Sequence, residues 1–242
     1  MHYAEHAPAP QAAPFIRAIW TLKGNAASGD WLSFDAMPDG CLEIIHRTAG
    51  RSIWHGEQPE LFVAGVCTGP ARLEFTGDAQ FTGVRLWPWT WNRIGQPPAA
   101  KLLDRWSGLS GHPLFEDFDR AQGRIVERVT GLLSSLSPDP IGRTIPSATC
   151  PGEIALASRR SERTVQRWFR SEIGMTARQY LRLLRFQGAI QDDGMAANKG
   201  LADQAAAFGY SDQAHMARDF RSFSGRTART VRSSAKGPFV ER

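Results

Sequence analysis

The fold is decided by two stretches of the same layout, Ile154-Ala-Leu-Ala-Ser-Arg-Arg-Ser-Glu-Arg-Thr-Val-Gln-Arg-Trp-Phe-Arg170 and Leu201-Ala-Asp-Gln-Ala-Ala-Ala-Phe-Gly-Tyr-Ser-Asp-Gln-Ala-His-Met-Ala-Arg-Asp-Phe-Arg221. Each reads as a short alanine-containing helix, a tight turn and a second helix that carries polar side chains. Small side chains on the first helix allow its partner to cross at close range. Gly174 and Gly225 follow where a helix C-terminus favours a residue of positive φ. The sequence therefore predicts two helix-turn-helix units in tandem.

Turn and cap residues support these boundaries. Gly209 stands between two aromatic residues in the turn of the second unit, where it can take positive φ without a steric cost. Ser161 and Ser211 precede the second helices, and we expect their hydroxyls to cap them. Thr176 and Thr227 lie two residues after the exit glycines and are expected to cap the helices that follow.

The second helix of each unit separates apolar from polar residues. The apolar residues lie three to four positions apart, which places them on one inward face; they are Val165, Trp168 and Phe169, and Met216, Phe220 and Phe223. The opposite faces contain arginine and glutamine, which bind guanine and adenine at major-groove edges. Such faces can also be plain solvated helix surfaces, but two units of matched layout favour DNA binding.

Residues 154–231 resemble the DNA-binding domain of AraC/XylS-type transcription regulators. The residues that carry the resemblance are Ala157, Ser161, Arg163, Val165, Arg167, Phe169, Gly174, Tyr180, Arg185, Phe186, Gln187, Ala189, Ala202, Ala205, Gly209, Tyr210, Asp212, Arg218, Asp219, Phe220, Gly225, Arg226 and Thr227. The resemblance implies two subdomains, joined by a long helix, that place their recognition helices in successive major grooves.

The same resemblance implies which side chains contact DNA. By position, the first reading set is Arg163, Thr164, Gln166 and Arg167. The second reading set is Gln213, Ala214, Ala217 and Arg218, with His215 nearby. Arg178 and Arg182 lie outside these faces, and we expect them to hold phosphates and set the register on the duplex.

Basic residues are concentrated in this half of the chain. Residues 1–150 contain 13 Lys+Arg against 15 Asp+Glu, a balance of −2, and residues 151–242 contain 16 against 9, a balance of +7. Together these make the net charge of +5. A basic segment favours a polyanion through phosphate neutralisation and counterion release. The charge therefore agrees with the helical pattern, although a basic surface can equally face an acidic protein.

Length and composition exclude several classes of protein. A chain of 242 residues holds one large or two ordinary domains. No apolar run approaches the roughly twenty residues that span a bilayer, and the first residues lack the regions of a secretion signal. Cys41, Cys67 and Cys150 are too scattered for a disulfide framework. We therefore expect a cytoplasmic protein with no membrane partner.

Residues 1 to about 110 predict an antiparallel β barrel or sandwich. Short β-favouring runs alternate with turn signals, of which Asp39-Gly40 is the clearest; the runs are 31–37, 41–46, 52–55, 61–66, 71–75 and 81–87. Through Met37-Pro-Asp-Gly-Cys-Leu-Glu-Ile-Ile45 and Gly83-Val-Arg-Leu-Trp-Pro88, this half is similar to the N-terminal sensor domains of a subset of AraC-type regulators. That similarity implies a cupin-like barrel. The predicted fold is α+β in two domains, the second all-α.

Six of the tryptophans lie within residues 20–91. Aromatic residues fill cores, but barrel mouths also provide aromatic pockets for small ligands. Under the second interpretation, Trp31, Trp54 and Trp87 wall a pocket for a small apolar or planar effector.

No metal, cofactor or catalytic site is predicted. Cys41, Glu43 and His46 are close in sequence, but in a strand His46 lies on the face opposite to the other two. The chain has no His-x-His or Cys-x-x-Cys pair. It also lacks a glycine-rich phosphate loop and a nucleophile elbow.

From Pro97 the pattern becomes helical. Residues 99–106 predict one helix and residues 113–136 a longer one with an apolar stripe. This stripe has two open uses, which are packing on the barrel and a seam between two chains; the resemblance favours a homodimer. Residues 137–150 are rich in proline and read as a stiff linker. The polar tail 233–242 is expected to be loose.

These patterns predict a sensor and possible dimerisation domain at 1–136, a linker at 137–150 and a DNA-binding domain at 151–242. The predicted function is a transcription regulator, not an enzyme, that binds double-stranded DNA under the control of a small-molecule effector. RNA polymerase would be a further partner if the protein activates. Two alternatives stay open: a cupin-like enzyme with a DNA-binding appendage, and a constitutively DNA-bound protein-interaction module.

Overall fold

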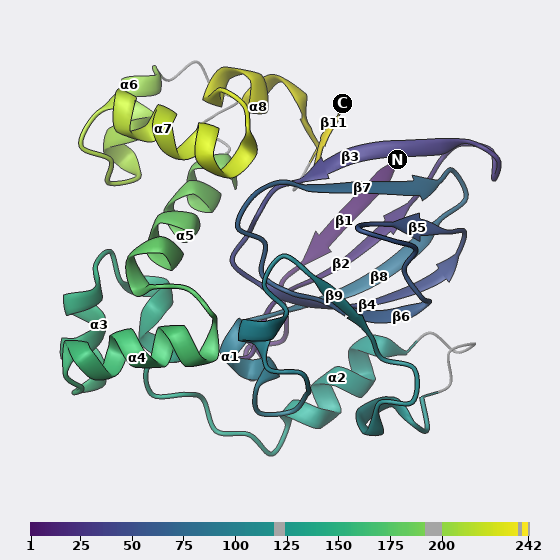
Figure 1. The fold of residues 1–242 in the computed structure, drawn as a ribbon, viewed down its shortest axis with the longest axis horizontal. Coiled ribbons are helices and arrows are strands. Elements are labelled where there is room, and N and C mark those ends of the chain that lie inside the picture. Colours follow the sequence, from purple (N-terminus) through teal and green to yellow (C-terminus); the bar gives the residue numbers. More distant parts are fainter. Residues whose placement is uncertain (119–123, 192–199, 237–238, 242) are drawn as a thin grey trace.

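A β domain and two helical units make up the structure, which is a computed structural model that describes residues 1–118, 124–191, 200–236 and 239–241. In Figure 1 the strands lie on one side, and the helical units are stacked on the other with helix α5 running between them. This arrangement confirms the predicted fold class of antiparallel sheets followed by tandem helix-turn-helix units.

The β domain contains two antiparallel sheets. The larger has the strand order β1-β2-β8-β4-β6-β9 and the smaller has the order β10-β11-β3-β7-β5. The strands are β1 (His2–His6), β2 (Ile16–Lys23), β3 (Trp31–Ala36), β4 (Leu42–Ala49), β5 (Ser52–Ile53), β6 (Leu61–Ala64), β7 (Ala71–Thr76), β8 (Gln80–Leu86), β9 (Trp106–Gly108), β10 (Ala235–Lys236) and β11 (Phe239–Glu241). All six strands expected from the short runs are present, and the sequence interpretation missed the other five.

The larger sheet is covered on both faces, which explains why five of the eight residues of β4 are buried. Leu42 and Ile44 point to a core shared with helix α2, whereas Ile45 points to an aromatic core between the two sheets. The turn before β4 is built by Asp39, whose carboxylate accepts the Cys41 amide at 2.8 Å, and by Gly40 at φ +77°. The predicted Asp39-Gly40 turn is therefore confirmed.

The helices are α1 (Pro88–Trp91), α2 (Ile125–Leu133), α3 (Pro151–Ser158), α4 (Glu162–Glu172), α5 (Ala177–Gln191), α6 (Leu201–Ala207), α7 (Gln213–Ser224) and α8 (Ala228–Ser234). Short 3₁₀ turns occupy Ala99–Lys101, Pro113–Phe115 and Gly142–Ser147. Among the described residues, no helix has the length and apolar character needed to cross a membrane.

Two helix predictions between the domains were wrong. The segment 99–106 makes only a 3₁₀ turn, because Asp104 takes a left-handed φ of +56° and its carboxylate accepts the Thr68 amide and hydroxyl, both at 2.7 Å. The segment 113–136 is helical only as the 3₁₀ turn and α2, and its residues 119–123 lie outside the described part. The apolar face of α2 (Ile125, Val129 and Leu133) is buried against the larger sheet, so packing on the β domain is the confirmed use of this stripe, and the homodimer stays a prediction.

The proline-rich segment and the tail are packed rather than free. Ile141 and Ile145 of the segment are buried in a core that also contains residues of both domains. The expectation of a loose tail was wrong, because β11 pairs with β3 and the side chain of Phe239 enters the aromatic core between the sheets. Figure 1 shows this strand beside β3, far in sequence from its partner.

Candidate nucleic-acid interface and inner cavity

Helix α4 presents the first predicted reading set. Ser161 caps the helix as expected, with its hydroxyl accepting the Thr164 amide at 3.2 Å. Val165 and Phe169 are fully buried, which fixes the opposite face outward. On that face Arg163, Gln166 and Arg167 are exposed, while Thr164 is half-buried and shares a 2.9 Å hydrogen bond with the hydroxyl of Ser161.

Helix α7 presents the second set, with one correction to its start. The cap is Asp212, one residue later than the expected Ser211, because Asp212 has the extended backbone of a cap and its carboxylate accepts the His215 amide at 2.6 Å. This backbone hydrogen bond, helped by the Ser211 hydroxyl, lowers the pKa of Asp212. The exposed residues are Gln213, Ala214, Ala217 and Arg218, and His215 is half-buried with its ring edge-on to Tyr210.

The other turn and cap predictions are confirmed. Gly174, Gly209 and Gly225 take positive φ of +84°, +69° and +67°. The hydroxyl of Thr176 accepts the Gln179 amide at 3.2 Å, and that of Thr227 accepts the Thr230 amide at 3.2 Å.

The two expected phosphate contacts differ in their surroundings. Arg178 is exposed and lines a surface pocket with Gln166 and Arg170 of α4, so a predicted reading residue and a predicted phosphate contact lie close together. Arg182 instead pairs with the buried Asp219 at 2.5 Å and lies over the Phe223 ring. A buried carboxylate needs such a partner, so Arg182 joins α5 to α7, and its phosphate contact stays a prediction.

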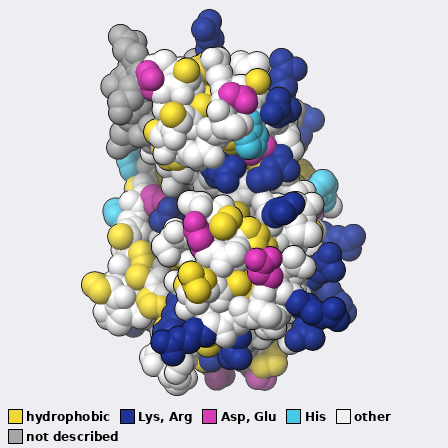
Figure 2. Space-filling view, turned by 90° about the vertical axis from the view of Figure 1, so that its left-hand side faces the viewer, with side chains coloured by type: hydrophobic (Ala, Val, Ile, Leu, Met, Phe, Trp, Pro, Cys, Tyr) yellow, Lys and Arg dark blue, Asp and Glu magenta, His cyan; other side chains and the backbone are white. Residues whose placement is uncertain are grey.

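Figure 2 looks onto the two helix-turn-helix units from their outer side. Lys and Arg side chains gather mainly along one edge of this face, over both the upper and the lower unit, with a further group at the opposite lower corner, and fewer acidic side chains lie between them. This face of the helical units is therefore predominantly basic.

A shared core joins the helical units to the β domain. Trp89 stacks on Trp87 with ring centres 5.3 Å apart and contacts the rings of Trp168 and Tyr180. The Tyr180 hydroxyl donates a 2.6 Å hydrogen bond to the Gly40 carbonyl. Near the second unit, Arg226 forms an ion pair with Asp35 at 2.9 Å. Apart from the Trp87–Trp89 stack, these contacts join residues far apart in the chain, so local sequence patterns do not predict them.

A cavity of about 100 Å³ lies between the two sheets of the β domain. Of the three tryptophans expected to wall an effector pocket, only Trp54 lines it. Trp31 is 43% exposed, with Arg51 over its ring, because its strand position faces solvent. Trp87 is taken up by the shared core. The sequence interpretation missed Trp20, which lines the cavity, although its place in an alternating run from Ile16 would have indicated an inward position.

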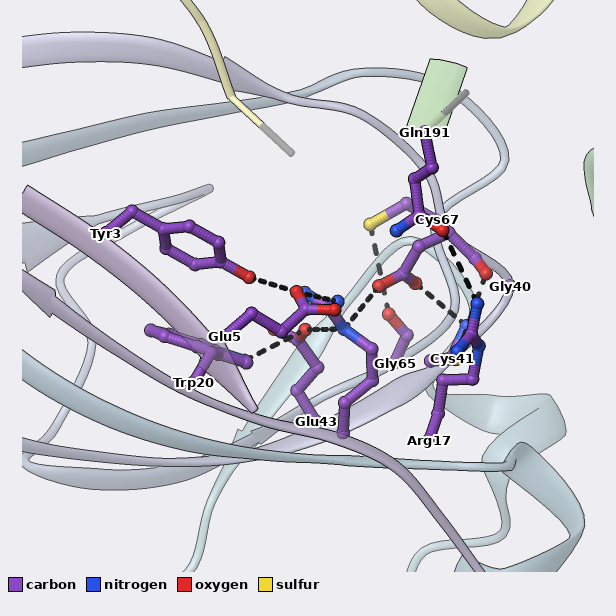
Figure 3. A network of polar contacts seen from close by, with 12 residues as sticks. Tyr3, Glu5, Arg17, Trp20, Gly40, Cys41, Glu43, Gly65, Cys67 and Gln191 are labelled. Atoms are coloured by element: carbon purple, nitrogen blue, oxygen red, sulfur yellow. Dashed lines mark hydrogen bonds and ion pairs between the residues drawn. The ribbon is translucent and has the colours of Figure 1, made fainter. Parts of the chain in front are cut away.

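One end of the cavity is polar. The guanidinium of Arg85 lies 2.6 Å from the carboxylate of Asp39, 2.7 Å from that of Glu43 and 2.9 Å from that of Glu5. Trp20 also donates to Glu43, and Figure 3 shows Glu5, Trp20 and Glu43 close together beside Tyr3. Burial raises the pKa of Glu43, and Arg85 opposes that rise. Burial alone would lower the pKa of Arg85, but Asp39 and Glu43 raise it above its ordinary value.

The described residues contain no group of three His, Cys, Asp or Glu side chains placed to hold a metal. Cys41 and Glu43 do share the cavity face of β4. His46 lies on the other face, with its ring against Phe118, as the strand argument predicts. Burial raises the pKa of the Cys41 and Cys67 thiols, which disfavours the reactive thiolate.

Two known protein families match the chain, one in the β domain and one in the helical units. Residues 154–234 match a family described as "Helix-turn-helix domain", and residues 4–107 match one described as "Domain of unknown function (DUF6597)". No curated protein sequence matches the chain.

Among solved structures, the chain is similar to ToxT from Vibrio cholerae in a P21 crystal form, with 9% identity, a TM-score of 0.48 and coverage of 98% of this chain and 100% of that chain. Another similar structure is wild-type ToxT from Vibrio cholerae with a bound unsaturated fatty acid, with 10% identity, a TM-score of 0.42 and coverage of 93% and 92%.

Proposed function

We propose that the protein is a sequence-specific transcription regulator, not an enzyme, whose inner cavity holds a small-molecule effector. Residues 154–234 match a helix-turn-helix family, and the same stretch resembles the DNA-binding domain of AraC/XylS-type regulators. The observation that carries the proposal is the pair α4 and α7. Each buries its apolar side and exposes its polar side, and α5 joins the two units. Two such helices fit neighbouring major grooves about one helical turn apart.

Arginine chemistry supports base reading rather than simple charge attraction. Arg167 and Arg218 are both exposed, and no ion pair or hydrogen bond with another described residue engages either guanidinium. A free guanidinium can bind guanine through two parallel hydrogen bonds. Arg178 is likewise exposed and stands beside the first reading helix, where a phosphate contact would fix the register.

The turn before β4 supports effector control. Met37, Asp39 and Cys41 line the cavity on one side of this turn. On its other side Gly40 accepts the Tyr180 hydroxyl and lies against the side chain of Leu184, and both of these residues belong to α5. A ligand that moves the turn therefore also moves α5, the helix that sets the distance between α4 and α7. A ligand can shift the equilibrium only by its different affinities for the two arrangements.

The tail supports a second route to the DNA-binding unit. Phe239 forms part of the cavity wall, and its strand follows α8 of the second helix-turn-helix unit. The Arg226–Asp35 ion pair lies on the same route, since Arg226 precedes α8 and Asp35 lies on β3. Ligand binding in the cavity would thus affect the positions of both helix-turn-helix units.

The test is selection of duplexes from a random pool by the purified full chain, followed by binding titrations. We expect one enriched sequence with two contacted segments about one helical turn apart, bound roughly a thousandfold or more tighter than unrelated duplexes. Equal binding to all duplexes would leave a non-specific polyanion-binding protein and remove the regulator proposal.

A further inference from the structure

The inner cavity has an aromatic part and a polar end of defined charge. The aromatic walls come from both sheets and from the tail, and are formed by Trp20, Trp54, Phe62, Phe75, Phe81 and Phe239. The polar end holds the guanidinium of Arg85 and the carboxylates of Asp39 and Glu43, with Glu5 completing the cluster from β1. A ligand placed here meets π-faces on one side and this cluster on the other.

The cluster contains more negative than positive groups. Three carboxylates surround one guanidinium that is almost fully buried. The other nearby cation, Arg17, lies over the Trp87 ring and donates to Gln191, outside the cavity lining. The cavity end therefore favours a positive guest and disfavours a carboxylate, because a second anion would add to the repulsion.

Two polar atoms of the lining are left for a ligand. Oε1 of Glu43 accepts Trp20 and Arg85, but within the described part of the chain Oε2 of Glu43 receives no hydrogen bond. Ser52 lines the same cavity from β5, is 4% exposed, and its hydroxyl has no hydrogen-bond partner among the described residues. A buried hydroxyl without a partner costs free energy, so it indicates a group that is supplied on binding.

We infer that the cavity binds a compact organic cation, an ammonium carrying a small apolar substituent, with the ammonium at Glu43 and the substituent among the aromatic rings. Aromatic faces attract a cation and also accept its apolar substituent. The volume of about 100 Å³ limits the substituent to a small ring or a short chain, since a cavity of roughly 150 Å³ holds benzene. The inference deepens the proposed function and rests on its assignment of the cavity to an effector.

The test uses three probes of nearly equal shape on the full chain, each with fewer carbon atoms than benzene: isobutylamine, isobutanol and isobutyrate. At neutral pH only the first is a cation. Calorimetric titration and thermal unfolding should show binding and stabilisation by isobutylamine, about tenfold or more weaker binding of isobutanol, and no binding of isobutyrate. Equal or tighter binding of the alcohol or of isobutyrate, or no binding of any probe, overturns the inference.

A matched pair of variants locates the ammonium. Glu43→Gln keeps the shape and should weaken the binding of isobutylamine about tenfold or more. Glu74→Gln on β7, which removes a partly exposed carboxylate paired with Arg72, should not change it. Unchanged affinity in Glu43→Gln contradicts the inference. If that variant does not fold, Ser52→Ala replaces it and should weaken the amine severalfold, whereas unchanged affinity in that variant also contradicts the inference.

Duplex binding by the same preparation, measured without any probe, keeps the two proposals apart. Specific DNA binding together with no binding of isobutylamine contradicts only the ligand class. Binding of isobutylamine together with uniform DNA binding contradicts only the regulator proposal.

Discussion

The hydroxyl of Tyr180, on the helix that joins the two helix-turn-helix units, donates a 2.6 Å hydrogen bond to the carbonyl of Gly40, in the turn that opens β4. Both groups are buried. The same turn contributes Asp39 and Cys41 to the cavity lining. This hydrogen bond therefore connects the candidate effector site to α5, the helix that joins the two helix-turn-helix units.

Tyr180→Phe should lower the free energy of unfolding by about 1–2 kcal/mol, because the Gly40 carbonyl is left buried without a donor. The matched control is Tyr210→Phe. The Tyr210 hydroxyl is buried and has no hydrogen-bond partner among the described residues, so its removal should be neutral or slightly stabilising. Urea unfolding of both variants measures the difference. Equal changes in the free energy of unfolding would contradict a stabilising role for the Tyr180–Gly40 hydrogen bond.

Arg167→Ala and Arg218→Ala should each cost about 1–3 kcal/mol on the selected duplex and relax base preference at one position. Arg178→Ala, the phosphate candidate, should weaken binding to all duplexes alike and reduce the salt slope by about one. Binding titrations at several salt concentrations separate these effects. Uniform weakening by the first two variants would make them phosphate contacts.

Introducing glycine at position 159 should stabilise the protein, whereas removing the glycine at position 209 should destabilise it. Arg159 ends α3 with a left-handed φ of +54°, and Gly209 takes φ of +69° in the corresponding turn. Since left-handed backbone is costly for a residue with a Cβ, Arg159→Gly should raise stability by about 0.5–1 kcal/mol. Gly209→Ala should lower stability by about 1 kcal/mol. This cost comes from the left-handed backbone alone, because nothing lies within 4 Å of an added Cβ. Thermal unfolding tests both, and a loss of stability in Arg159→Gly would contradict the argument.

Phe239→Ala should destabilise the chain by about 3 kcal/mol. The ring is 5% exposed and lies 5.5 Å from the ring of Tyr3 and 6.3 Å from that of Phe34. Leu156→Ala is the control, since Leu156 is 83% exposed and buries little of its surface. Chemical denaturation gives both values. A negligible effect of Phe239→Ala would show that the tail does not hold the sheet in solution.

Asp212→Asn should reduce the fall in the free energy of unfolding that occurs as the pH is lowered. The His215 amide holds the pKa of Asp212 below its ordinary 3.8, so the ionised cap stabilises the folded state above that value and this stabilisation is lost as the pH falls through the lower folded pKa. Asparagine caps without titrating. Urea unfolding between about pH 3 and pH 6 should show the two proteins converging at the acid end; parallel curves would contradict the assignment.

Local patterns predicted the helical units well. Caps, exit glycines and apolar spacing depend on neighbours within one or two turns, so Ser161, Gly174 and Phe169 could be assigned from the sequence. The Ser211 error is of the same local kind, since two capping residues stand side by side and the backbone selects Asp212.

Contacts between distant segments decided the rest. Strand β2 has the clean alternation of a strand, with Ile16, Ala18, Trp20 and Leu22 buried, so the sequence alone is enough to predict it. In contrast, nothing near Arg85 in the sequence shows that three carboxylates from other strands meet it. The use of Trp87 in the shared core and of Phe239 in the cavity wall likewise depends on tertiary packing.

The pairing of β11 with β3 has a consequence for biosynthesis. Phe239 pairs with Ala36, so the ribosome makes one partner about two hundred residues before the other. Chains grow from the N-terminus at a few residues per second or faster, and during that interval β3 keeps an open edge. The smaller sheet can be completed only after the helix-turn-helix units have emerged, and a nascent chain stalled before them would expose an unpaired strand to aggregation.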